Sequence, residues 1–227
     1  MKNDKKNQKI EIVEDGPYIV SGNVNLSEKI ITPKGMGYEY KDGRQFPQSE
    51  EYKLCRCGKS KNAPFCDDSH EEVGFKGTET ASKAKYIDRA EVFEGPGLDL
   101  MDDHRCALAR FCHTEEGNTW DLLEVSDDPK YREAVIKGAS ECPTGRLVAL
   151  DKTGKAFEPE YEPSIEILQD PENGASAGIF VKGNIPIVSS DGETYEIRNR
   201  VVLCRCGQSN NKPFCDIGHI HTTFSDK

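Results

Sequence analysis

Six of the nine cysteines and two of the five histidines lie in two segments with the same spacing. Residues 55–70 read C-R-C-G-K-S-K-N-A-P-F-C-D-D-S-H, and residues 204–219 read C-R-C-G-Q-S-N-N-K-P-F-C-D-I-G-H. Both have the form C-x-C-x8-C-x3-H. Because thiolates and imidazoles are ligands of soft metals, each segment predicts a site with three sulfur ligands and one nitrogen ligand. The candidate ligands are Cys55, Cys57, Cys66 and His70 in the first copy, and Cys204, Cys206, Cys215 and His219 in the second.

The spacing favours a [2Fe–2S] cluster over a single metal ion. A C-x-C pair can hold one iron, and Cys66 and His70 are four residues apart, so they share a face if a helix begins near Cys66. Structural zinc is the alternative, but its paired thiols are usually separated by about two to four residues, which makes C-x-C tight for one small ion. A disulfide framework is disfavoured because the number of cysteines is odd.

Residues between the ligands suit such a site. Asp67 can accept hydrogen bonds from the free amides of a helix start, and Pro64 stiffens the approach. Gly58 suits a tight turn next to a cluster. Pro213 and Asp216 occupy the corresponding positions of the second copy.

The two segments resemble the CDGSH iron–sulfur family, whose members include mitoNEET-like proteins and whose motif is C-x-C-x2-(S/T)-x3-P-x-C-D-G-x-H. The matching supporting residues are Ser60, Pro64 and Asp67 in the first copy, and Ser209, Pro213 and Asp216 in the second. The motif's glycine is replaced by Asp68 and by Ile217. The resemblance implies one [2Fe–2S] cluster in each copy, bound by three cysteines and one histidine.

Similar segments also surround each motif, so the repeat is a small β-rich domain. Short β-branched segments punctuated by glycine precede it at 16–26 and 178–187, and further strands are expected at 52–54 and 201–203. Closing strands are expected at 73–75 and 222–224, and residues 29–50 are expected to form an exposed loop. The predicted fold class is α+β, with CDGSH-type domains at 14–82 and 174–227 flanking a small domain at 84–165.

The middle segment holds the remaining cysteines in the pattern C-x5-C…C-P, formed by Cys106, Cys112 and Cys142. Pro129 follows Ser126, Asp127 and Asp128, which predicts the start of an amphipathic helix that ends near Cys142. The segment resembles a divergent single-cluster bacterial-type ferredoxin in which Ala109 stands at the middle cysteine position.

Three thiolates suit a [3Fe–4S] cluster. A [4Fe–4S] cluster is the alternative, and its fourth ligand would come from His104, from His113, from a carboxylate or from water. The structural alternative is three buried free cysteines, a common role for this residue.

Composition restricts the possible partners. The net charge of −10 argues against nucleic acid and against anionic membrane surfaces. No run of about 18 apolar residues is present, and the lysine-rich start, residues 2–9, lacks the apolar core of a signal peptide. We expect a reduced cytoplasmic protein. Its partners would be redox proteins or apo-acceptors, and its two CDGSH copies would form an internal pseudo-dimer within a monomer.

These features predict an electron carrier with two [2Fe–2S] clusters and one [3Fe–4S] or [4Fe–4S] cluster. The alternatives are a cluster donor or redox sensor, and a zinc-stabilised binding module. No nucleotide-binding or hydrolytic motif is present, so we do not expect an enzyme.

Overall fold

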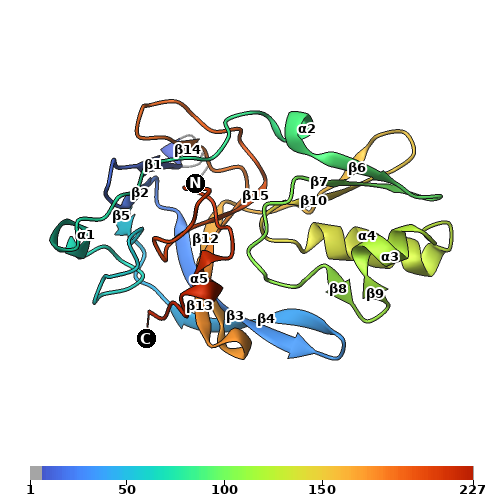
Figure 1. Ribbon diagram of the computed structural model, residues 1–227, viewed down its shortest axis with the longest axis horizontal. Helices are drawn as coiled ribbons and strands as arrows, with labels where there is room; N and C mark the ends of the chain where they lie inside the picture. The colour runs from blue at the N-terminus through green and yellow to red at the C-terminus, as the bar shows by residue number, and fades with distance from the viewer. Residues whose placement is uncertain (1–6, 227) are drawn as a thin grey trace.

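The strands around the two C-x-C segments are shared between two mixed sheets. The computed structural model describes residues 7–226, so most of the lysine-rich start lies outside the described residues. The first sheet has the order β14-β1-β2-β5 and the second has the order β15-β13-β12-β3-β4 (Figure 1). The first sheet consists of β1 (Lys9–Ile12), β2 (Tyr18–Ser21), β5 (Glu51–Leu54) and β14 (Ile187–Val188). The second consists of β3 (Asn25–Lys34), β4 (Gly37–Gln45), β12 (Ser164–Asp170), β13 (Ala175–Lys182) and β15 (Arg200–Leu203).

Each copy of the repeat contributes its third strand to the sheet of the other copy. By chain order, β1, β2, β3 and β5 correspond to β12, β13, β14 and β15. β3 pairs in parallel with β12, and β14 pairs in parallel with β1, whereas all other pairs in these two sheets are antiparallel. The exchange places apolar residues of both copies, such as Tyr18, Leu54, Ile179 and Leu203, in one buried core.

The region between the copies, residues 84–163, is called the central region below. Its sheet has the order β11-β10-β7-β6. The elements of the central region are α2 (Tyr86–Arg89), β6 (Glu91–Glu94), β7 (Asp99–Asp102), β8 (His113–Thr114), β9 (Gly117–Asn118), α3 (Thr119–Leu123), α4 (Pro129–Ser140), β10 (Leu147–Leu150) and β11 (Ala156–Phe157). The helix predicted at Pro129 is present, and the Asp128 side chain caps it by accepting a 2.8 Å hydrogen bond from the amide of Lys130. It buries Ala134, Val135 and Ala139 against the sheet.

Two local expectations about the repeat were wrong. Residues 29–50 do not form an exposed loop; most of them belong to the long hairpin of β3 and β4. Two contacts hold this hairpin in place. β3 pairs with β12, and Tyr40 stacks on Phe111 of the central region with 4.3 Å between the ring centroids. The segments 73–75 and 222–224 are turns and irregular chain, not strands.

The remaining helices are short. They are α1 (Ser69–Glu72), the 3₁₀ helix η2 (Pro171–Asn173) and α5 (Gly218–His221). Among residues 7–226, no helix has both the length and the apolar character that a membrane crossing requires. The expected mixture of small sheets and short helices, with a CDGSH-type segment on either side of a central region, is what the structure has.

Candidate metal centres

The first ligand set is delivered by a strand and by the loop that returns beside it. β5 ends at Leu54, and the amide of Cys55 donates to the carbonyl of Pro64 at 2.8 Å. The amide of Cys66 donates to the carbonyl of Lys53 at 2.9 Å. These bonds hold the two halves of the motif together, with 3.6 Å between the sulfurs of Cys55 and Cys57 and 3.5 Å between Cys66 Sγ and His70 Nδ1.

The second ligand set repeats this geometry. The amide of Cys204 donates to Pro213 at 2.8 Å, and the amide of Cys215 donates to Val202 at 2.9 Å. The sulfurs of Cys204 and Cys206 are 3.6 Å apart, and Cys215 Sγ is 3.4 Å from His219 Nδ1. The two copies therefore build the same arrangement of two ligand pairs.

These distances indicate two metal ions in each copy. Ligand atoms around one tetrahedral metal, with bonds of about 2.0–2.3 Å, lie roughly 3.5–3.8 Å apart, so each pair suits one ion. The four ligands of a copy do not converge on one point. In the described part of the chain, the only three candidate ligands whose atoms all lie within 4.8 Å of one another are Cys66, Asp68 and His70. The carboxylate of Asp68 lies 3.8 Å from Cys66 Sγ, a neighbour of the site that the spacing of the motif did not predict.

The ligand loops are tied together by the supporting residues of the motif. The hydroxyls of Ser60 and Ser209 donate to the carbonyls of Phe65 and Phe214 at 2.6 and 2.7 Å. Asp67 accepts the amide of Lys61 at 2.8 Å, as Asp216 accepts that of Asn210 at 2.7 Å.

The helix that carries each histidine begins later than expected. α1 starts at Ser69 and not near Cys66, and α5 starts at Gly218. Asp68 and Ile217 precede these helices in the left-handed conformation, with φ of 65° and 76°. This is the position where the CDGSH motif has glycine, so the backbone shape is kept although the glycine is not. A β-branched residue is strained in this conformation.

The two thiols of each C-x-C pair differ in pKa, and the first of them is the more easily ionised. A hydrogen bond from Cys57, together with backbone amides including that of Ser60, lowers the pKa of the Cys55 thiol to about 6. The hydrogen bond from Cys206 does the same for Cys204, whose pKa is also about 6. The pKa of the second thiol of each pair is raised, because this thiol donates the hydrogen bond to the first, is buried, and would place a second negative charge beside the first. Metal binding would therefore release a proton from each pair.

The two sites differ in their exposure. Cys66 and His70 are half-buried, whereas Cys215 is 3% exposed and His219 is 1% exposed. Burial lowers the pKa of His219 to about 4. Its Nδ1 atom, 3.4 Å from Cys215 Sγ, is placed to share a metal with that thiol, and its Nε2 atom is buried with no hydrogen-bond partner.

The arginines between the ligand cysteines are buried and hold the fold together. Arg56 donates to the carbonyls of Val13 and Gly77 at 2.8 and 2.5 Å. Arg205 donates to the carbonyl of Ala177 and pairs with Asp226 at 2.5 Å. Each of them connects the ligand loop to chain segments before and after it.

The three cysteines of the central region line one cavity. Cys106, Cys112 and Cys142 share it with Trp120 and Arg146. Burial and the other two thiols raise the pKa of Cys112 to about 11. Neither His104 nor His113 lines this cavity. His104 is exposed and faces Glu91 and Asp102, and His113 Nδ1 is 3.6 Å from Cys112 Sγ.

A known protein family matches both copies of the repeat. The family model described as iron-binding zinc finger of the CDGSH type matches residues 15–71 and 177–220, and does not match the central region. No curated protein and no solved structure matches the chain. The two matched segments contain both C-x-C-x8-C-x3-H ligand sets. Residues 15–71 and 177–220 therefore each carry a CDGSH-type iron-binding segment, which implies that these two parts of the chain bind iron–sulfur clusters.

Proposed function

We propose that the protein is a one-electron carrier that holds a [2Fe–2S] cluster in each CDGSH domain and a third iron–sulfur cluster in the central region. The observation that carries this proposal is the division of each CDGSH ligand set into two close pairs, at 3.6 and 3.5 Å in the first copy and 3.6 and 3.4 Å in the second. Two such pairs suit a two-iron cluster better than one zinc ion. Such a cluster accepts and releases single electrons, and a neutral histidine ligand raises its potential.

The central cysteines support a third cluster. Leu108 and Arg110, two residues apart, have positive φ values of 54° and 66°, and the amide of Leu108 points to Cys106 Sγ at 3.3 Å. Alternating backbone conformations of this kind form concave arrays of amides that bind anions, iron–sulfur clusters included. Three thiols around one cavity suit [3Fe–4S]. His104 does not line that cavity. His113 does not line it either, but its Nδ1 is 3.6 Å from Cys112 Sγ, so His113 is the candidate fourth ligand if the cluster is [4Fe–4S].

The carrier would work without an enzymatic activity of its own, in the cytoplasm, with redox proteins as partners. The exchange of β3 and β14 between the two copies supports a monomer, since the strand pairs that a second chain would supply are made within this one. The backbones of the two C-x-C loops also lie in contact, because Gly58 approaches Cys206 and Gly207 approaches Cys57. Such closeness favours electron exchange between the two halves of the protein.

Anaerobic EPR spectroscopy, combined with iron and sulfide analysis, tests the proposal. We expect about seven iron and about eight sulfide per chain, from two [2Fe–2S] and one [3Fe–4S] cluster. The Cys142→Ser variant should lose the central signal and keep both two-iron signals. A colourless protein that contains zinc after anaerobic purification would overturn the proposal. If the protein contains two clusters and the three central cysteines are free thiols, the part of the proposal that concerns a third cluster is wrong.

A second candidate function, cluster donation or redox sensing, is favoured by the exposure of the first site. Cys66 and His70 are half-buried, so an acceptor could reach this end of the ligand set. Mixing the holoprotein with an apo-ferredoxin, followed by separation of the two proteins, tests this function. Iron and sulfide on the ferredoxin would support donation, whereas reduction of a holo-acceptor without metal transfer would support electron transfer.

A further inference from the structure

We propose that residues 103–112 of the central region, called the cap loop, retain the cluster of the second CDGSH domain, so that only the first domain exchanges its cluster readily. The cap loop also contains Cys106 and Cys112, two candidate ligands of the central cluster. The same loop therefore connects the central site to retention of the second CDGSH cluster. This inference rests on the proposed function, because it requires a cluster in both CDGSH domains.

The starting observation is a difference between two sites with the same internal geometry. Their ligand distances agree within 0.1 Å, yet His219 is 1% exposed while His70 is half-buried. The difference in exposure therefore comes from what covers the sites. Figure 1 shows α1 at one edge of the molecule, whereas α5 lies in the middle, between α1 and the central region.

The cap loop supplies apolar cover for the second site. Ala107 belongs to the same buried cluster as the ligand Cys215, together with Phe180. Arg105 lies over the ring of Phe214, with 4.2 Å from its guanidinium carbon to the ring centroid. Cys106 and Cys215, candidate ligands of two different centres, line the same surface cleft.

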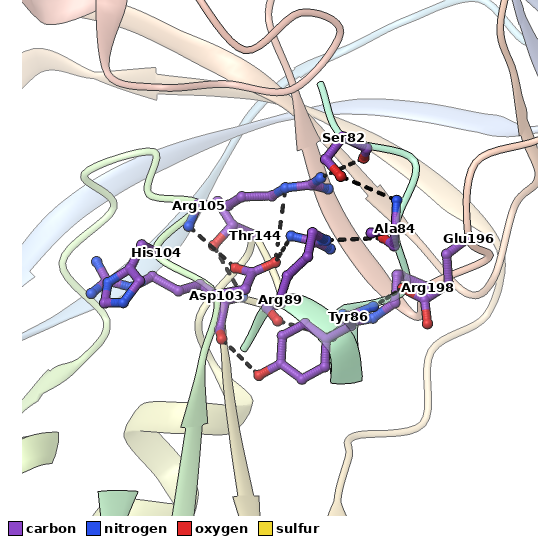
Figure 2. A network of polar contacts seen from close by, with 12 residues as sticks. Ser82, Ala84, Tyr86, Arg89, Asp103, His104, Arg105, Thr144, Glu196 and Arg198 are labelled. Atoms are coloured by element: carbon purple, nitrogen blue, oxygen red, sulfur yellow. Dashed lines mark hydrogen bonds and ion pairs between the residues drawn. The ribbon is translucent and has the colours of Figure 1, made fainter. Parts of the chain in front are cut away.

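The start of the cap loop is held by a polar network. The carboxylate of Asp103 accepts the amide of Arg105 at 3.2 Å and pairs with Arg89 at 2.7 Å. The Arg105 guanidinium reaches across to the carbonyl of Ser82 at 3.1 Å. Figure 2 shows these side chains converging on Asp103, with His104 pointing away from them.

The far end of the cap loop is held by an ion pair to the second CDGSH domain. Arg110 binds both carboxylate oxygens of Asp170 at 2.8 Å, and Asp170 is 1% exposed at the end of β12. Arg110 also lies over the ring of Tyr38, 4.5 Å from its centroid. A buried bidentate pair of this kind is directional and costly to break, so it fixes the loop across the second site.

The test measures iron release from the anaerobic holoprotein. Dithionite is the reductant, and the ferrous chelator bathophenanthroline disulfonate captures the released iron while the cluster absorbance is followed. We expect two phases for the two-iron clusters, at least about tenfold apart in rate. Cys66→Ser should remove the fast phase, and Cys215→Ser should remove the slow phase.

The cap loop is then weakened without touching any ligand. Arg110→Ala should accelerate the slow phase at least about fivefold and leave the fast phase unchanged. Arg110→Lys keeps the charge and loses the bidentate contact, so it should have an intermediate effect. Arg132→Ala is the matched control, because Arg132 is a half-buried arginine of α4 that lies over Phe157, and it should change neither phase.

Several outcomes would overturn the inference. Equal release rates for the two clusters would do so, as would removal of the slow phase by Cys66→Ser. An Arg110→Lys protein that folds with full iron content but releases the second cluster at the original rate would also contradict it. These outcomes leave the proposed function standing, since its test is the iron and sulfide content and the EPR signals, which do not depend on the rates of release.

Discussion

Gly58 of the first ligand loop lies directly against the backbone of Cys206 in the second. A Cβ atom at Gly58 would be 2.7 Å from the carbonyl oxygen of Cys206, and one at Gly207 would be 2.6 Å from that of Cys57. Both glycines have positive φ, 72° and 78°. The contact is reciprocal, so the two CDGSH domains meet through the residues that follow their C-x-C pairs, and a change at one glycine reaches both metal sites.

We therefore expect Gly58→Ala to destabilise the protein and both CDGSH centres. The added methyl group clashes with backbone that cannot move away, which costs about 1–3 kcal/mol beyond the conformational strain. Gly74→Ala is the matched control, because Gly74 has φ of 59° but nothing within 4 Å of the added Cβ. Denaturant unfolding of the two variants gives the difference. Equal free energies of unfolding would show that the contact with Cys206 has no cost.

The strain at Ile217 predicts a stabilising substitution. Ile217 has φ of 76°, and the left-handed conformation costs an L-residue about 1–2 kcal/mol. Ile217→Gly should raise the free energy of unfolding by about 1 kcal/mol, after the greater unfolded-state entropy of glycine is subtracted. Thermal unfolding of the holoprotein measures the change. Asp68→Gly should gain less, because aspartate tolerates this conformation better than isoleucine, and a larger gain at Asp68 would contradict the explanation.

The buried His219 predicts a pH-dependent stability of the metal-free protein. Burial holds the pKa of His219 at about 4, below the usual histidine value of about 6.5, so the native state favours the neutral ring. Its contribution to stability is complete above about pH 6.5 and is lost as the pH falls towards 4, up to about 3 kcal/mol. Urea unfolding between pH 7 and pH 4 measures this slope. His219→Asn should flatten the slope and His221→Asn should not, and an unchanged slope in His219→Asn would exclude this histidine as its cause.

Arg200 connects the second CDGSH domain to the central cysteines. Its buried guanidinium donates to the carbonyls of Ala139, Ser140 and Cys142 at 2.7, 2.7 and 2.8 Å, and it pairs with Glu158 at 2.6 Å. Arg200→Met would leave these buried acceptors unpaired, so we expect a loss of about 3 kcal/mol or more. Denaturant unfolding checks the stability, and EPR should show the central signal weakened more than the two-iron signals. Arg132→Met is the control for loss of a half-buried arginine in the same region, since Arg132 lies over Phe157.

The candidate ligands could be found from the sequence because the spacing of each set is local. C-x-C-x8-C-x3-H lies on one strand end, one loop and one helical turn, so neighbouring residues carry all four ligands of a site. The same holds for α4, whose start was set by Asp128 and Pro129. Local patterns failed where long-range pairing decided the outcome. Residues 29–50 read as a polar loop, yet they form β3 and β4 because β12, far along the chain, pairs with β3.

The sequence by itself therefore determined the repeat, the spacing of the two candidate ligand sets and the α+β class, since these follow from short-range spacing and periodicity. Only the tertiary structure decided that the copies exchange strands, that Cys106, Cys112 and Cys142 line one cavity, and that Cys215 and His219 are buried while Cys66 and His70 are half-buried. The two ligand segments have the same ligand spacing and share 11 of 16 residues, so the spacing alone does not predict this difference. Around the second site, Ala107 packs in the cluster that contains Cys215, Arg105 lies over Phe214 and Arg110 pairs with Asp170, and all three contacts join distant parts of the chain.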